Sequence, residues 1–170
     1  TVSVLYWQPP MPKLDVRIVG AKGLPNVQTF GKIDPYCSIE LEHKKFETKY
    51  KDNTTDPQWD EVFKFNVADP SSSQIHLRVW NKNNVSDDFL GEAYVGLAGL
   101  TRGVVDDRTV LLKNCKSNAE LRIRLMAQDF GADPSPQQQQ QHQQQPAGSP
   151  PPQGQYPPPQ QGAYPPQQGG

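Results

Sequence analysis

Apolar and polar residues alternate in eight short stretches of this chain, which is the period-two pattern of β-strands with one buried face. In the first stretch, Leu14, Val16 and Ile18 are separated by charged residues. Clusters of Asn, Asp, Ser, Gly and Pro fall between the stretches, as in turns, and no convincing amphipathic helix is present. The pattern therefore predicts an all-β fold, an eight-stranded antiparallel β-sandwich. The predicted strands cover residues 13–19, 35–41, 43–51, 59–67, 75–80, 89–95, 109–113 and 119–126.

The junction between the first loop and the second strand places a carboxylate at a defined position. Gly31 relaxes the backbone for a turn, and Pro35 moves the preceding Asp34 into an extended conformation. Proline is tolerated at the first position of a strand, where no ladder donor is needed. Asp34 is therefore held at the mouth of a strand, as a metal ligand or as a plain turn residue.

Composition divides the chain into three parts: an N-terminal extension at residues 1–12, a folded domain at 13–126 and a tail at 127–170. All 17 Lys and Arg residues lie in the middle part, as do all but two of the 18 acidic residues. This near-neutral balance argues against a nucleic-acid binder. The tail is rich in Gln, Pro and Gly and is expected to be disordered.

The sequence also indicates a cellular compartment. No stretch approaches the roughly 20 apolar residues of a membrane-spanning helix, and no signal peptide is recognisable. The two cysteines, Cys37 on an apolar strand face and Cys115 in a polar turn, are expected to be free thiols in a reducing compartment. We therefore expect a cytoplasmic protein.

Four motifs follow one another along the predicted strands. They are Leu14-x-Val16-x-Ile18-x-x-Ala21-x-x-Leu24, then Gly31-x-x-Asp34-Pro35-Tyr36, then Asp56-Pro57-x-Trp59-x-Glu61-x-Phe63-x-Phe65, and finally Val79-Trp80 leading to Asp87-Asp88-Phe89-Leu90-Gly91-Glu92. Together they resemble a C2 domain. The resemblance implies a Greek-key sandwich whose loops at one end bind Ca²⁺ and phospholipid. It favours the circularly permuted, phospholipase C-like (type II) strand order, with residues 13–19 as strand one.

The C2 resemblance implies a calcium site of about five acidic positions, and here the acids are depleted. Asp34 matches one first-loop position, but the other is Gln28. In the third loop Asn81 and Asn83 occupy two acidic positions. We expect one weak Ca²⁺ site or none, because amide oxygens coordinate without neutralising the ion. The alternative is that the asparagines only stabilise turns.

The last acidic position of the resemblance falls on two neighbouring residues. Asp88 precedes the Phe89-Leu90-Gly91 motif and matches the position, and Asp87 lies beside it. The loop is one residue shorter than the common pattern, so the two carboxylates compete for the same role. Both remain candidate ligands.

Two further sets of residues are candidates for contact with an anionic phospholipid membrane. Phe30 and Val85 are apolar residues at the expected tips of the first and third loops. A cationic strand face is expected to contact the lipid headgroup, with two aromatic residues that match positions in phosphoinositide-binding C2 domains; a solvated strand face is the alternative. This headgroup set is Lys45, Lys49, Tyr36 and Trp80.

No catalytic constellation is present in the sequence: there is no zinc-spaced cysteine set, no supported Ser/His/Asp arrangement and no Gly-rich phosphate loop. We therefore do not expect an enzyme. The first functional hypothesis is a peripheral phospholipid-binding module. The alternative is a protein-interaction adaptor that has lost most calcium ligands and whose tail self-associates; an inert spacer is a further interpretation of the tail.

Overall fold

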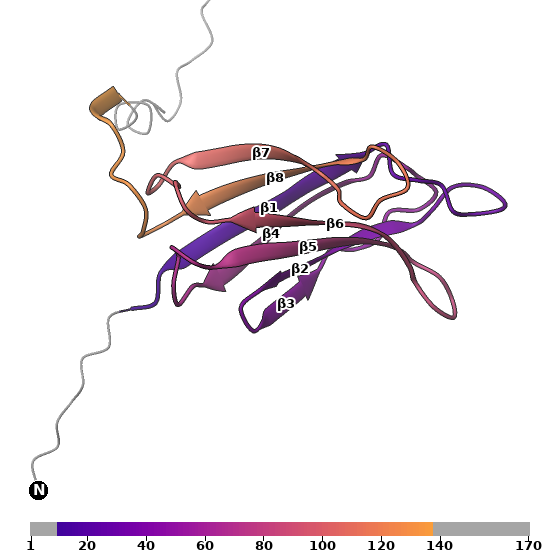
Figure 1. The fold of residues 1–170 in the computed structure, drawn as a ribbon, viewed down its shortest axis with the longest axis horizontal. Coiled ribbons are helices and arrows are strands. Elements are labelled where there is room, and N and C mark those ends of the chain that lie inside the picture. Colours follow the sequence, from indigo (N-terminus) through magenta and orange to yellow (C-terminus); the bar gives the residue numbers. More distant parts are fainter. Residues whose placement is uncertain (1–9, 138–170) are drawn as a thin grey trace, which may run out of the picture.

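The computed structural model describes residues 10–137, which form two four-stranded antiparallel sheets packed face to face (Figure 1). The strand order is β4-β1-β8-β7 in one sheet and β3-β2-β5-β6 in the other. The predicted all-β sandwich is therefore confirmed. The strands are β1 (Lys13–Lys22), β2 (Pro35–Leu41), β3 (Lys44–Glu47), β4 (Gln58–Asn66), β5 (Gln74–Asn81), β6 (Asp88–Gly96), β7 (Val105–Leu111) and β8 (Glu120–Ala127).

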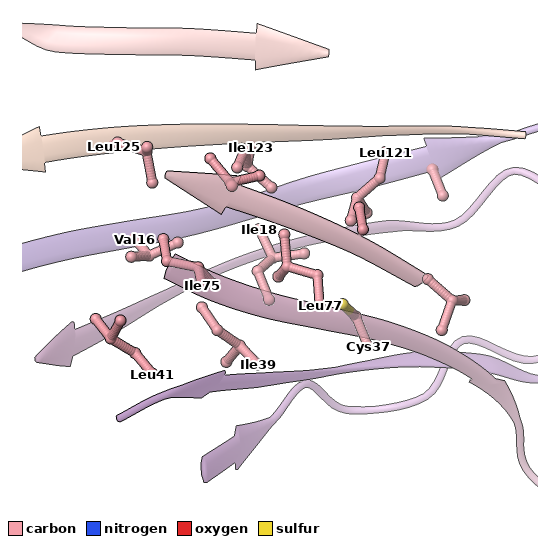
Figure 2. Close-up of a cluster of buried hydrophobic side chains, with 14 of the residues drawn as sticks. Val16, Ile18, Cys37, Ile39, Leu41, Ile75, Leu77, Leu121, Ile123 and Leu125 are labelled. Atoms are coloured by element: carbon pink, nitrogen blue, oxygen red, sulfur yellow. The ribbon is translucent and has the colours of Figure 1, made fainter. Parts of the chain in front are cut away.

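The core lies between the sheets and is built from the apolar positions of the alternating pattern (Figure 2). Cys37, which the sequence places on an apolar face, is fully buried. Burial of these side chains is the main favourable contribution to folding, at about 25 cal/mol per Å² of apolar surface. The inward residues of four central strands are Leu14, Val16 and Ile18; Cys37, Ile39 and Leu41; Ile75, Leu77 and Val79; and Leu121, Ile123 and Leu125.

Two strand ends differ by four residues from the sequence prediction, and β1 continues to Lys22, three residues past its predicted end. β7 begins at Val105, not at residue 109, because its acidic start is stabilised across the sheet: Asp107 accepts hydrogen bonds from Arg122 and Arg124 of β8. β3 ends at residue 47, not at 51. Thr48 then turns inward, where its hydroxyl accepts a hydrogen bond from the backbone N–H of Cys37.

The two loops that carry most of the candidate site residues lie at one end of the sandwich. The loop after β1, residues 23–34, and the loop between β5 and β6, residues 82–87, project from the same end in Figure 1. We call them the first loop and the third loop. The start of β1 and the end of β8 lie at the opposite end, where Leu14 pairs with Ala127.

Residues beyond β8 continue to contact the sandwich. Phe130 packs against the core, and Ala132 forms an isolated bridge with Thr101. The predicted extension at 1–12 and the predicted tail fall mostly outside the described residues, so their boundaries stay predictions. Within residues 10–137 no helix is long and apolar enough to cross a bilayer.

Candidate functional site

The first loop holds an apolar side chain at its tip. Leu24 and Ile33 are buried at its two ends and anchor it to the core. Asn26 donates a hydrogen bond from Nδ2 to the carbonyl oxygen of Gly31 (2.9 Å), and Gly31 takes a left-handed φ of 74° that suits glycine. The turn leaves Phe30 at the tip with 91% of its surface exposed.

The loop between β3 and β4 supports the first loop from the side. Asn53 accepts the backbone N–H of Lys32 at Oδ1 (2.7 Å) and donates its own backbone N–H to Asp34 Oδ1 (2.7 Å). Asp34 thus accepts a backbone donor of the neighbouring loop at one of its two carboxylate oxygens.

The third loop is closed by its own side chains. The backbone N–H of Asn83 donates to Asp87 Oδ1 (2.9 Å), and Asn83 Nδ2 donates to the carbonyl oxygen of Ser86 (3.0 Å). Val85 stands between them at the tip and is 99% exposed. Both predicted membrane residues are thus presented to solvent on short turns.

Hydrogen bonds join the two loops. Asp34 donates its backbone N–H to Asn81 Oδ1 (2.8 Å) and accepts the backbone N–H of Lys82 at its carbonyl oxygen (2.9 Å). Gln28 donates from Nε2 to Asn83 Oδ1 (3.1 Å). The structure therefore brings together Gln28, Asp34, Asn81 and Asn83.

The two candidate acids of the third loop have different partners. Asp88 Oδ2 accepts from Nδ2 of Asn81 (3.2 Å) and from Nδ2 of Asn83 (2.8 Å). Asp87 Oδ2 instead accepts the Tyr36 hydroxyl (2.7 Å) and lies 3.3 Å from Lys82 Nζ. Asp88 thus accepts hydrogen bonds from the side-chain amides of the third loop and β5. Asp87 accepts the Tyr36 hydroxyl on the outer surface of the sheet that contains β2 and β5.

Asp87 and Tyr36 each have a shifted pKa, and the two shifts keep Asp87 ionised and Tyr36 protonated. The N–H of Asn83, and then the Tyr36 hydroxyl, lower the pKa of Asp87 below its ordinary value. Burial, and then the contact with Asp87, raise the pKa of Tyr36 well above its ordinary value. At neutral pH the pair is a phenol donating to a carboxylate.

As arranged, these side chains do not fit a Ca²⁺ ion. Ca²⁺ takes six to eight oxygen ligands, whereas the groups directed at Asp88 are N–H donors of two amides. Lys82 adds a positive charge beside Asp87. Among residues 10–137, no three His, Cys, Asp or Glu side chains come together in a group that could hold a metal.

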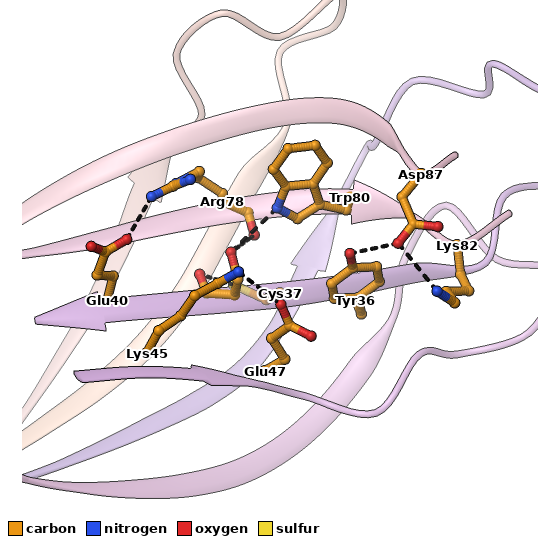
Figure 3. A network of polar contacts seen from close by, with 10 residues as sticks. Tyr36, Cys37, Glu40, Lys45, Glu47, Arg78, Trp80, Lys82 and Asp87 are labelled. Atoms are coloured by element: carbon orange, nitrogen blue, oxygen red, sulfur yellow. Dashed lines mark hydrogen bonds and ion pairs between the residues drawn. The ribbon is translucent and has the colours of Figure 1, made fainter. Parts of the chain in front are cut away.

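Three of the predicted headgroup residues, Tyr36, Lys45 and Trp80, lie on one sheet face with acids among them (Figure 3), whereas Lys49 follows the end of β3. Lys45 forms an ion pair with Glu47 (3.0 Å), and Trp80 donates from Nε1 to the hydroxyl of Ser38 (3.2 Å). Tyr36, Lys45 and Trp80 line one shallow recess, whereas Lys49 lines a neighbouring recess that Tyr36 also borders. Paired lysines offer less attraction to a phosphate than free ones.

Sequence reasoning noted the positions of two residues at this end of the molecule but missed their partners. Asn53 connects the first loop to the β3–β4 loop, and Lys82 neutralises Asp87. The Asp52-Asn53 pair in a turn cluster was a signal for Asn53, because Asn readily adopts its left-handed φ of 52°. The position of Lys82 could be read from the sequence, but its partner could not.

Comparison with known proteins agrees with this geometry. The fold and the site define an antiparallel β-sandwich with two hydrogen-bonded loops exposed at one end. The C2 domain family matches the chain over residues 12–112, which is more than half of its length. The chain therefore belongs to the C2 domain family.

Curated relatives share the domain within longer proteins. "FT-interacting protein 7" of Oryza sativa subsp. japonica is 35% identical over 97 residues, which is 57% of this chain and 12% of that protein. "Synaptotagmin-4" of Arabidopsis thaliana is 32% identical over 135 residues, 73% of this chain and 24% of that protein. The chain thus spans a quarter or less of the length of these relatives.

Solved structures show the same fold. A C2 domain of plant Extended Synaptotagmin 1 superposes with a TM-score of 0.67 at 24% identity, covering 73% of this chain and 99% of that one. Human GIVD cytosolic phospholipase A2 gives a TM-score of 0.65 at 21% identity, covering 74% of this chain and 17% of that one.

Proposed function

We propose that the chain is a peripheral phospholipid-binding module that docks through the tips of its first and third loops. One observation carries the proposal: Phe30 and Val85 are 91% and 99% exposed on two loops that hydrogen bonds join at one end of the sandwich. Large apolar side chains held in water on short turns are typical of an interaction surface. A curated relative from Arabidopsis thaliana, 27% identical over 134 residues, carries the name "Calcium-dependent lipid-binding protein".

Each contact contributes a modest free energy to membrane binding, and the contributions add up. Burying the Phe30 ring in the bilayer contributes roughly 1.5–3 kcal/mol, and Val85 adds a smaller amount. Lysines near an anionic leaflet contribute about 1 kcal/mol each, and Lys32 lies in the first loop. The ion-paired Lys45 contributes less, so the loop tips supply most of the binding energy.

Vesicle co-sedimentation of the full chain tests the proposal. We expect pelleting with anionic vesicles, and the double variant Phe30→Ala/Val85→Ala should reduce the partition coefficient about tenfold or more, since about 1.4 kcal/mol is tenfold. Val105→Ala is the control: Val105 is 53% exposed, but its pairing with Met126 places it at the end of the sandwich where β1 begins and β8 ends.

Two outcomes would contradict the proposal. One is an equal loss of binding in the Val105→Ala control. The other is no pelleting on neutral or anionic vesicles, with or without Ca²⁺. The second outcome would favour the protein-interaction adaptor, whose self-associating segment lies in residues outside the described part of the chain.

A further inference from the structure

The amide side chain of Asn81 has a fixed orientation at the centre of the two loops. Asn81 is 0% exposed, so water cannot replace its partners. Its Oδ1 accepts the backbone N–H of Asp34 (2.8 Å), and a backbone N–H can only donate. Its Nδ2 is therefore directed at Asn83 Oδ1 (3.2 Å) and Asp88 Oδ2 (3.2 Å).

The orientation of Asn83 is fixed by the same reasoning. Its Nδ2 faces the carbonyl oxygen of Ser86 (3.0 Å) and Asp88 Oδ2 (2.8 Å), which both accept only. Its Oδ1 is left to accept Nε2 of Gln28 (3.1 Å) and Nδ2 of Asn81 (3.2 Å). Each of these amide N–H donors therefore faces an acceptor. The hydrogen bonds connect the first loop, the third loop and the start of β6.

We propose that this amide network, made of Gln28, Asn81, Asn83 and Asp88, takes the place of a bound cation and holds the two loops together at any Ca²⁺ concentration. The inference rests on the proposed function in one respect: the loops that the network fixes are those whose tips dock on lipid. The network itself is a property of the folded protein and can be tested without a membrane.

Two physical reasons separate the network from a calcium site. To offer oxygens in place of N–H groups, Asn81 would have to rotate its amide and leave the Asp34 N–H without an acceptor inside the protein. The amide N–H groups also stabilise the negative charge of Asp88, because two of them donate to the same Oδ2. A cation bound at Asp88 would have to displace these hydrogen bonds.

Thermal unfolding of the full chain tests the network directly. We expect the Tm of the wild-type protein to be the same in EGTA and in millimolar Ca²⁺. In EGTA, Asn83→Asp should lower the Tm by roughly 5–10 °C, because it replaces two donated hydrogen bonds with a second carboxylate beside Asp88. Asn84→Asp is the matched control: it adds the same charge to an exposed residue of the same loop and should leave the Tm nearly unchanged.

A triple variant provides the converse test. Gln28→Asp/Asn81→Asp/Asn83→Asp replaces all three amides with carboxylates, so its Tm should be low in EGTA and should rise on addition of Ca²⁺. A wild-type Tm that rises with Ca²⁺ would overturn the proposal. An equal Tm for Asn83→Asp and Asn84→Asp in EGTA would also overturn it, and that comparison stands even where the triple variant does not fold.

Vesicle binding then separates failure of the network from failure of the proposed function. Wild-type protein should pellet with anionic vesicles to the same extent in EGTA and in Ca²⁺, and the triple variant should pellet in Ca²⁺ only. Wild-type pelleting that requires Ca²⁺ overturns the network and leaves lipid binding intact. Absence of wild-type pelleting in both conditions overturns lipid binding, whereas the Tm comparison still decides the network.

Discussion

Asp87 and Asp88 are adjacent in the chain, and Asn83 donates a hydrogen bond to each of them, but their other partners differ. Asp88 accepts amide N–H groups that lie between the two loops, whereas Asp87 accepts the Tyr36 hydroxyl and faces Lys82 on the outer sheet surface. The donors around Asp87, first the N–H of Asn83 and then the Tyr36 hydroxyl, lower the pKa of its carboxyl group. The two acids therefore respond differently to changes made around them.

The Tyr36→Phe substitution should raise the pKa of Asp87 toward its ordinary value, because it removes one of the hydrogen bonds that lower it. With a folded-state pKa below the ordinary 3.8, ionised Asp87 contributes stability that is complete above that value and is lost as the pH falls through the folded-state pKa. A carboxyl-carbon NMR titration measures the shift. Tyr94→Phe, on β6, is the control and should leave Asp87 unchanged; equal pKa values in Tyr36→Phe and wild type would contradict the assignment.

At the scale of elements, β1 is a central strand whose pairing is irregular on both sides. It pairs with both β4 and β8, and its register shifts between Ile18 and Gly20 against both neighbours. A Cβ at Gly20 would lie 2.4 Å from the carbonyl oxygen of Pro57, which accepts the backbone N–H of Ala21 (3.0 Å). Glycine is needed here because of close backbone approach, not because of its φ angle.

Gly20→Ala should lower the free energy of unfolding by about 1–3 kcal/mol, because the backbone of residue 57 must move and the Ala21 hydrogen bond weakens. Urea denaturation measures the change. Gly96→Ala, at the end of β6, is the matched control, since a Cβ there meets no atom within 4 Å. A similar loss of stability in both variants would show that the close approach at Gly20 is not what requires glycine.

The alternating pattern was sufficient to predict the sandwich and its inward residues, because a strand with one buried face carries that information in its own sequence. It was not sufficient for β7, whose start at Val105 depends on cross-strand pairs between Asp107 and two arginines of β8. The candidate ligands Gln28, Asn81 and Asn83 were found from their positions. The direction of their amides depends on partners distant in the chain, such as the backbone N–H of Asp34, so spacing alone could not predict it.

At the scale of the whole molecule, the folded body continues past the last strand. Gln128 donates its backbone N–H to the carbonyl oxygen of Lys13 (2.9 Å), and Ala132 exchanges backbone hydrogen bonds with Leu100 (2.9 Å) and Arg102 (2.8 Å). Phe130 covers part of the core nearby. Residues 128–133 thus close the end of the sandwich that lies away from the loop tips.

A chain that ends at Asp133 should therefore be more stable than a chain that ends at Ala127, by about 2–4 kcal/mol, because three backbone hydrogen bonds contribute about 0.5–1.5 kcal/mol each and Phe130 adds apolar packing. Chemical denaturation of the two truncated chains measures the difference. Equal stabilities would mean that these contacts contribute nothing and that the folded body ends with β8.

The pairing of Leu14 with Ala127 brings the start of β1 and the end of β8 to the end of the sandwich remote from the first and third loops (Figure 1). When the tips rest in a bilayer surface, both connections leave on the distal side. β1 has 10 residues and a length of about 33 Å, so in the proposed docking the sandwich would separate its two ends by about that distance. Any domain or partner joined to either end is then held clear of the lipid headgroups and free to meet molecules approaching from the aqueous phase.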